Sequence, residues 1–329
     1  MQSNLKRRRD VAYQLSIHIF LAAIVVLSGH YAWAEENGSG AYPPGSIASG
    51  IDSMLPAPGW IIRPNYYNFS GENAIDCLAA TCTDRAKVRA NVNALSLTLG
   101  WRPDIDLGSR YAYMVSISVP YVFVDVTTTV TSNSTGASTQ LSDSNQGLGD
   151  AELIPINLSY HVDDKNDLNF KLVGRAPTGE FDKNQLANLG KNYWSVEPTI
   201  SYLYNDNKAG LQGAIYVGVN FNETNPDTDF HSGSQAHVEY TLKKKFAYGG
   251  GQIGGGLTGY TYRQISDDSG SGVVFPNQRS RLSGIGPVIS YTGNLFGQFA
   301  DAEIKWVHDY EIENRFGGDT LILKAGLIF

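Results

Sequence analysis

Apolar and polar residues alternate along most of the chain from about residue 59 onward. The clearest run is 111–123, in which seven successive odd positions, from Tyr111 to Phe123, are apolar and mostly small or polar residues lie between them. Odd and even side chains of a strand point to opposite faces of the sheet. The run therefore predicts a strand with one continuous apolar face that carries aromatic residues at both ends.

The same alternation recurs in 193–204, 211–222, 235–243 and 300–311, where the face opposite the apolar one carries many charged residues. A water-soluble β-sandwich also alternates, but its inner face is dry, and a dry core does not accept unpaired charges. A wet lumen does accept them, while lipid covers the apolar face. At about 13 residues, the run at 111–123 is also longer than the 5–6 residues of a typical soluble strand.

Connections between the runs alternate in length. Short turns are expected at 163–167 and 205–210, and longer polar loops near 130–147, 179–191, 223–233 and 266–278. This asymmetry is typical of an outer-membrane barrel. We therefore predict an all-β fold, a transmembrane antiparallel β-barrel of about twelve strands within a range of ten to fourteen. Strand starts are expected near 60, 89, 110, 148, 168, 193, 211, 234, 248, 279, 297 and 319.

The two ends of the chain add separate signals. Residues 1–34 combine the basic run Lys6–Arg9, a largely apolar segment at 15–27 and the small-x-small sequence Ala32-Trp33-Ala34, which predicts a signal peptide cleaved before Glu35. A retained N-terminal anchor is the alternative. Residues 35–58 are rich in Gly, Pro, Ser and Ala and are expected to form a flexible periplasmic arm or a plug, ahead of a barrel at 59–329. The last strand alternates up to Phe329, which resembles the signal read by the barrel assembly machinery.

Composition narrows the classes of partner. The chain carries a formal charge of -7, which argues against a nucleic-acid partner. Cys77 and Cys82 are its two cysteines, and an exported protein meets an oxidising compartment, so a loop disulfide is expected, with two free thiols as the alternative. Two cysteines without paired histidines nearby do not make a zinc site, and we predict neither a metal nor a cofactor.

Three motifs could carry chemistry. The run Gly249–Gly256 lacks the Lys-Ser/Thr of a phosphate loop and is better explained by close strand packing. His231-Ser232, with His237 and Glu239, raises the possibility of a lipid hydrolase, but His237 and Glu239 share the face that points inward. Asp301, Glu303 and Lys305 also share one face, and lumen ion pairs with lysines or arginines of other strands, Lys324 among them, explain them better than catalysis. We predict no catalytic residue. The lumen-lining candidates are Lys171, Arg175, Glu197, His237, Glu239, Lys243, Asp301, Glu303 and Lys305.

Short motifs in a fixed order give the chain a family resemblance. It resembles the outer-membrane family named after the meta-pathway of phenol degradation, the SphA-like transporters, over nearly the whole mature chain. The resemblance implies a barrel of about twelve strands that passes small, sometimes aromatic or hydrophobic, molecules, and it supplies no catalytic residues. Cys77 and Cys82 lie outside its pattern. The matching segments are Glu36–Gly38, Tyr42–Gly45, Gly147–Asp150, Pro177–Phe181, Asn188–Gly190, Asn192, Trp194, Asn220, Asn222, Ser232-Gly233, His237, Gly259-Tyr260, Gln264, Asp267, Ile285–Pro287 and Tyr291.

These observations favour a channel or uptake pore in the cell outer membrane. Its expected partners are outer-membrane lipid, the barrel assembly machinery, reached through Phe329, and a small-molecule solute. A barrel enzyme that acts on lipid, or a structural or adhesive barrel, is the alternative function. The pattern fits both an open lumen and a plugged one.

Overall fold

Long antiparallel strands make up most of the chain in the computed structural model, which describes residues 35–76, 84–132, 135–273, 277–295 and 297–329. Two short 3-10 helices, η1 (Glu36–Gly38) and η2 (Gly50–Asp52), precede the first strand. The strands of the large sheet are β1 (Gly59–Asp76), β2 (Asp84–Arg102), β3 (Tyr111–Ser132), β4 (Ser138–Leu148), β5 (Ala151–Asp163), β6 (Asn166–Ala176), β7 (Ser195–Asp206), β8 (Leu211–Asn222), β11 (Gln235–Tyr248), β12 (Gly251–Gln264), β13 (Arg281–Leu295), β14 (Gln298–Glu313) and β15 (Gly317–Ile328). A separate two-stranded sheet pairs β9 (Thr224–Asn225) with β10 (Phe230–His231).

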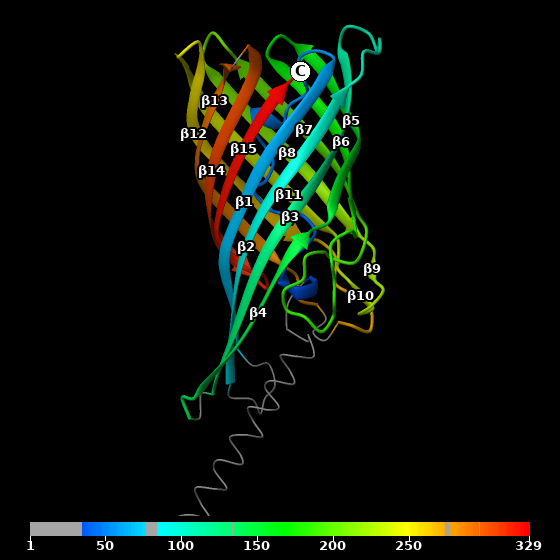
Figure 1. Ribbon diagram of the computed structural model, residues 1–329, viewed down its shortest axis with the longest axis vertical. Helices are drawn as coiled ribbons and strands as arrows, with labels where there is room; N and C mark the ends of the chain where they lie inside the picture. The colour runs from blue at the N-terminus through cyan, green and yellow to red at the C-terminus, as the bar shows by residue number, and fades with distance from the viewer. Residues whose placement is uncertain (1–34, 77–83, 133–134, 274–276, 296) are drawn as a thin grey trace, which may run out of the picture.

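The large sheet closes on itself, because the first strand pairs with the last. Strand β3 pairs with β5 through its first half and with β4 through its second half, so that β4 and β5 together occupy one position in the wall. The thirteen strands of this sheet therefore form an antiparallel barrel with twelve positions. Figure 1 shows the barrel from the side. The fold class and the strand number predicted from the sequence are confirmed.

One predicted loop is wrong. We expected a long loop at 130–147, but β3 continues to Ser132 and β4 begins at Ser138, and the two strands pair from Tyr121↔Leu148 to Thr131↔Ser138. Strand β4 is polar and largely exposed, so it lacks the alternation by which the other strands were found. It projects from the barrel in Figure 1. A strand needs an apolar face only where lipid or a core covers it.

The apolar faces point outward. In β7, the even residues Val196, Ile200 and Tyr202 are 40–61% exposed, whereas Ser195, Glu197, Thr199 and Ser201 are buried inside. The predicted stripe at 111–123 is likewise on the outside, with Ile117, Val119 and Tyr121 exposed and Ala112 and Met114 buried. An outward apolar band with an inward polar surface is the arrangement of a barrel in a bilayer. None of the helices in the described ranges is long and apolar enough to span a membrane.

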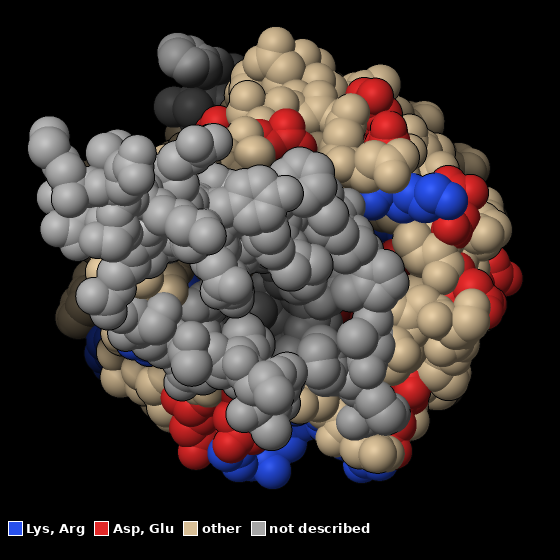
Figure 2. All heavy atoms as spheres, turned by 90° about the horizontal axis from the view of Figure 1, so that it is seen from below, with Lys and Arg blue, Asp and Glu red and all other residues tan. Residues whose placement is uncertain are grey.

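The two ends of the barrel differ. The connections 177–194, 223–234 and 265–280 gather at one end, and at the other end β5–β6, β7–β8 and β11–β12 are joined by tight turns. Long loops mark the extracellular end of such barrels and short turns the periplasmic end. Figure 2 looks onto the extracellular end, where acidic and basic side chains are interspersed around the visible rim. The start of β1 and the C-terminal residue Phe329 lie at the periplasmic end, where the backbones of Trp60 and Phe329 exchange two hydrogen bonds.

Candidate functional site

The segment 35–58 runs through the interior of the barrel. Glu35 lies at the extracellular end beside Asp268, and Leu55 lies at the periplasmic end, where Arg102 donates a hydrogen bond to its carbonyl. Between these points the carboxylate of Glu239 accepts hydrogen bonds from the backbone nitrogens of Gly45, at 2.8 Å, and Ile47, at 3.0 Å. The lumen is therefore occupied by the chain's own N-terminal arm.

An ionic cluster holds the arm near the periplasmic end. The Asp52 carboxylate accepts two hydrogen bonds of 2.8 Å from Lys324 of β15, and Arg63 of β1 is 3.9 Å away. Lys171 of β6 donates to the backbone carbonyl of Asp52 at 3.0 Å. These side chains are nearly inaccessible, and a buried charge is tolerated when it is paired and hydrogen-bonded. The cluster therefore ties η2 to three separate strands.

A second cluster lies higher in the lumen. Arg175 of β6 donates to Glu197 at 2.8 Å and is 3.2 Å from Glu152, while Glu197 also contacts His237 of β11 at 2.9 Å. Glu197 and His237 meet across β8 because Gly218 lies between them, where a Cβ atom would be 2.3 Å from Nε2 of His237. The Tyr42 ring of the arm stacks on His237, with ring centroids 3.9 Å apart.

The remaining predicted lumen residues lie close to the arm. Lys243 and Glu303 form a buried ion pair of 2.7 Å, and Lys305 is 3.7 Å from the same carboxylate. Lys305 also donates to the backbone carbonyl of Ile47. Asp301 is partly buried beside Gly326. All nine candidates therefore lie on inward-facing positions, and eight of them, all but Asp301, form the ion pairs and hydrogen bonds described above with one another or with the arm.

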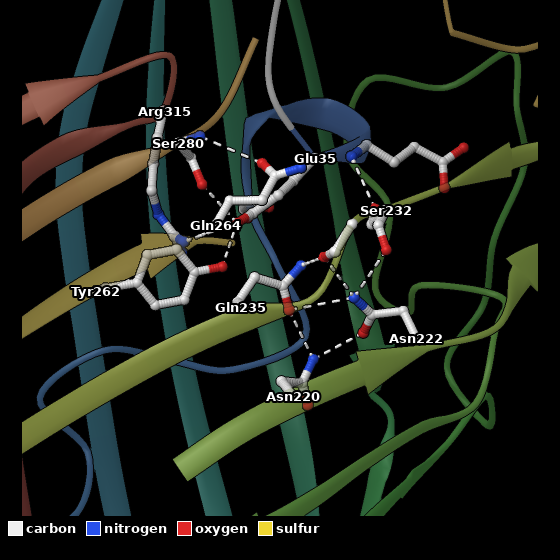
Figure 3. Close-up of polar contacts among 12 residues, drawn as sticks. Glu35, Asn220, Asn222, Ser232, Gln235, Tyr262, Gln264, Ser280 and Arg315 are labelled. Carbon is white, nitrogen blue, oxygen red and sulfur yellow. Dashed lines mark hydrogen bonds and ion pairs between the residues drawn. The ribbon is translucent and has the colours of Figure 1, made fainter. Parts of the chain in front are cut away.

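The arm ends in a polar socket at the extracellular end, shown in Figure 3. The Glu35 carboxylate accepts hydrogen bonds from Arg315 at 3.2 Å, from Ser280 at 2.7 Å and from Tyr262. The backbone nitrogen of Glu36 donates to Ser232 at 3.2 Å. Lys191, in the 177–194 connection, donates a hydrogen bond of 2.7 Å to the side chain of Ser39, and burial lowers the pKa of Lys191. The socket thus draws its side chains from several extracellular connections.

A cavity of about 900 Å³ lies between the arm and the wall made by β1, β2 and β3. Deep in the lumen its lining is mainly polar, whereas toward the extracellular end it has one apolar side. We call this extracellular part the vestibule; polar residues such as Lys183, Asn184 and Asp227 belong to its lining, and its apolar side is formed by Val88, Ala90, Val92, Val124, Val126, Leu189 and Phe316. Here the polarity of the wall is reversed, because the outward side chains at this height of β2 are Lys87 and Arg89, whereas Leu95, Leu97 and Leu99 point outward lower down. The apolar side of the vestibule therefore lies beyond the lipid-covered band.

The hydrogen-bond pairing between neighbouring strands of the barrel wall is interrupted next to the vestibule. Strand β6 ends at Ala176, opposite Ala151, so β4 pairs with β3 alone. The 177–194 connection covers the interruption. Asp150 accepts hydrogen bonds from the backbone nitrogens of Gly179, at 2.9 Å, and Lys191, at 2.7 Å. Gly179 and Gly190 approach so closely that a Cβ on either would meet the other's backbone at under 3.0 Å. At this place side-chain contacts, rather than strand pairing, close the wall.

The other predicted motifs occupy ordinary structural positions. Ser232 is hydrogen-bonded to Glu36, and His231 lies 3.5 Å from Thr224. His237 contacts Glu197 rather than the Glu239 with which the sequence grouped it. Within Gly249–Gly256, a Cβ at Gly256 would be 1.9 Å from the Leu242 carbonyl, which explains the need for glycine there. The predicted pair Cys77 and Cys82 lies outside the described residues.

Sequence reasoning missed several residues of the site. Asp52, Arg63, Glu152 and Arg315 contribute charges, and Tyr42 stacks on His237. Asp52 lies in the Gly- and Pro-rich arm, which carries no periodicity, and a single carboxylate in such a segment gives no pattern. Glu152 and Arg63 lie on strands, at positions that alternation identifies as inward only once the register is known.

Comparison with known proteins gives a consistent assignment of fold. An outer membrane channel from Pseudomonas putida F1 superimposes with a TM-score of 0.61 at 15% identity, over 86% of this chain and 100% of that one. The transport unit of the autotransporter AIDA-I from Escherichia coli gives a TM-score of 0.46 at 8% identity, over 86% of this chain and 94% of that one. No curated protein matches the chain.

The outward apolar band and the fold shared with the Pseudomonas putida channel identify the chain as an outer-membrane β-barrel. A family model described as "Putative MetA-pathway of phenol degradation" matches residues 65–325, nearly the whole barrel. The chain therefore belongs to the outer-membrane protein family that is named after this pathway of phenol degradation.

Proposed function

We propose that the protein is an outer-membrane channel that passes small hydrophobic molecules, including aromatic ones. The observation that carries this proposal is the vestibule, the extracellular part of the cavity of about 900 Å³, with its apolar side. The protein of Pseudomonas putida F1 with the same fold is an outer membrane channel. The family's association with phenol degradation agrees with an aromatic solute.

The chemistry of the vestibule favours transit over tight binding. A small aromatic solute that hides roughly 150 Å² of apolar surface gains about 4 kcal/mol, at ~25 cal/mol per Å². That free energy corresponds to a dissociation constant of about 1 mM. A solute held this weakly enters readily and also leaves, as a channel requires.

The proposed transport needs a route out of the cavity, and we consider two. One continues along the lumen toward the periplasm, where the arm and its ionic cluster at Asp52 lie across the path. The other passes the 177–194 connection at the interruption beside β4, toward the outside of the barrel at the extracellular edge of the lipid-covered band. Either route needs a movement, of the arm or of the connection. The contacts that hold these two segments are therefore the control points of transport.

Uptake across intact cells tests the proposal. Gram-negative cells that lack other routes for hydrophobic solutes would be given a radiolabelled small aromatic hydrocarbon, with and without the protein. We expect expression to raise the initial uptake rate, and Ala94→Phe, which fills the cavity from the wall of β2, to abolish the gain. The matched control is Leu95→Phe, one residue along the strand on the lipid side, where the side chain is 56% exposed.

Two outcomes would overturn the proposal. One is uptake that is no faster with the wild-type protein than without it. The other is faster uptake of a hydrophilic solute, such as a disaccharide, that Ala94→Phe abolishes while uptake of the aromatic hydrocarbon is not raised by the protein. The second result would assign the lumen to polar solutes.

We propose transport rather than catalysis, since the Pseudomonas putida protein of this fold is a channel, and Ser232 and His231 contact other groups.

We also propose that the barrel assembly machinery recognises Phe329, because of the position of this residue. It is 58% exposed at the periplasmic end of the barrel, where its backbone pairs with Trp60.

A further inference from the structure

The backbone nitrogen of Glu35 lies in a site that fits a cation better than a neutral amide. Glu35 is buried at the extracellular end of the lumen, and its nitrogen is 2.9 Å from Oδ2 of Asp268, in the connection between β12 and β13. The other donors to this carboxylate are the backbone nitrogen of Gly233, at 2.8 Å, and the side-chain amide of Gln264, at 2.6 Å. All three are neutral in an uncut chain.

Asp268 has no cationic partner among the side chains that the structure describes, although it is only 8% exposed. Arg315, the nearest guanidinium of the socket, is already paired with the Glu35 carboxylate at 3.2 Å. Burial and the neighbouring Glu35 carboxylate together raise the pKa of Asp268, which means that its ionised form is under-compensated. An ionised carboxylate that is buried calls for a charge of opposite sign.

The backbone of Glu35 is strained as part of a longer chain. Its φ is +66° and its ψ is +144°, in a region that is open almost exclusively to glycine. Such a conformation costs about 1–3 kcal/mol for other residues. The strain arises between the side chain and the preceding carbonyl, and it disappears if that carbonyl is absent.

We propose that the peptide bond between Ala34 and Glu35 is hydrolysed during export and that Asp268 binds the resulting α-ammonium group of Glu35. Hydrolysis adds one water across the bond, giving Ala34 a carboxylate and Glu35 an amino group that takes up a proton at neutral pH. Ala32-Trp33-Ala34 supplies the small-x-small sequence that a signal peptidase requires. This inference does not depend on which solute the barrel passes.

The ammonium group resolves both features of the socket. It gives Asp268 a cationic partner at hydrogen-bond distance, and the φ restriction on Glu35 no longer exists. Glu35 is then held at both of its charges, the ammonium by Asp268 and the carboxylate by Arg315. The processed end of the chain thereby anchors the arm at the extracellular mouth, opposite the cluster at Asp52.

The first test is chemical. Intact mass and N-terminal sequencing of protein extracted from the outer membrane should find Glu35 as the first residue, with a free amine. An amine-reactive label at neutral pH should modify this amine in the folded barrel at least about tenfold more slowly than in the unfolded chain, since a rise of one unit in its pKa lowers the neutral fraction tenfold. The pH dependence of labelling should give a pKa above the usual value of about 7.7–8.0 for an α-amine.

The second test removes the counter-charge. Asp268→Asn keeps the size and a hydrogen-bond acceptor but not the charge, and should return the labelling rate of Glu35 toward that of the unfolded chain. The control is Asp267→Asn, the adjacent carboxylate, which is exposed and pairs with Arg279 at 2.7 Å. It should label like the wild type.

Other outcomes would overturn the proposal. They are a mature N-terminus other than Glu35, a blocked amine, or a Glu35 amine that labels equally fast in the folded wild type and the unfolded chain. Should Asp268→Asn fail to fold, the wild-type comparison of folded and unfolded rates and the pKa of the amine still decide the matter.

Discussion

The ion pair between Asp52 and Lys324 should control how often the arm leaves the lumen. Asp52→Asn removes the charge but keeps the volume, so that Lys324 and Arg63 are left facing a neutral amide. Both partners are only about one-tenth exposed, at 8% for the Lys324 side chain and 11% for that of Asp52. The variant therefore leaves two cations inside the barrel without their carboxylate.

The size of the effect follows from this burial. Breaking a buried ion pair by removal of one partner costs about 3–5 kcal/mol. Because the amide keeps a hydrogen-bond acceptor and the lumen holds water-accessible space, we take a smaller cost than that range, about 2–3 kcal/mol. At 1.36 kcal/mol for each factor of ten, the population with a displaced arm should rise roughly 30- to 150-fold.

Single-channel recording in planar bilayers measures this population. The wild-type barrel should show rare openings to a higher conductance, and Asp52→Asn should raise their frequency by the factor above. The control is Asp106→Asn in the periplasmic connection between β2 and β3, where the exposed carboxylate accepts only a local hydrogen bond from Gly108. It should behave like the wild type.

A double-mutant cycle separates the ion pair from other effects. Lys324→Met alone should also increase the openings, and the double variant should open less often than the product of the two single effects, because the second change removes a charge that is already unpaired. Independent effects of the two variants, or an opening frequency in Asp52→Asn equal to that of the wild type, would refute the reasoning.

Three further predictions follow from the wall and the extracellular connections. Gly218→Ala places a Cβ 2.3 Å from His237 and should lower the free energy of unfolding by about 1–3 kcal/mol; an unchanged urea midpoint would count against the contact. Leu242→Arg, at a lipid-facing position that is 57% exposed, should lower the free energy of unfolding by about 2–4 kcal/mol when the same assay is performed in lipid vesicles. The folded variant should keep its secondary structure. Hydrogen bonds from Ser271 lower the pKa of Asp229, and they link the 223–234 connection to the 265–280 connection. This link should be fully formed above the ordinary pKa of an Asp and should be lost as the pH falls through the lowered pKa of Asp229. Hydrogen exchange of the two connections measures this loss, and Asp229→Asn should abolish its pH dependence.

The strands that lipid covers could be located from the sequence, because lipid on one side and water on the other determine whether each position is apolar or polar. In β7 and β11 the predicted inward positions, such as Glu197 and His237, are those that the structure buries, and the predicted outward ones are exposed. The first strand, the last strand and the short turns also begin within a few residues of their predicted places. Beyond the bilayer water surrounds both faces of a strand, so the apolar alternation is absent. For this reason the sequence predicts a loop where the structure has the polar strand β4.

Contacts inside the lumen could not be predicted in the same way. Glu239 was paired with its strand neighbour His237, but it binds the arm at Gly45, 194 residues away in the sequence. His237 instead contacts Glu197 on another strand, and that contact needs the glycine at position 218 between them. A pattern within one strand identifies which side chains enter the barrel but carries no information about which strands they meet.

The amino-acid sequence by itself determined that this chain exposes one face of each long strand to lipid, that about twelve such strands close a barrel, and that charged side chains enter its interior. These properties are local, since each side chain responds to lipid or water at its own position. Only the tertiary structure decided that the arm runs through the lumen, that Asp52 and Glu35 hold it at opposite ends, and that a vestibule with an apolar side lies between it and β2. Those features depend on the register of the strands and the closure of the barrel, which bring together residues more than 200 positions apart, as Asp52 and Lys324 are.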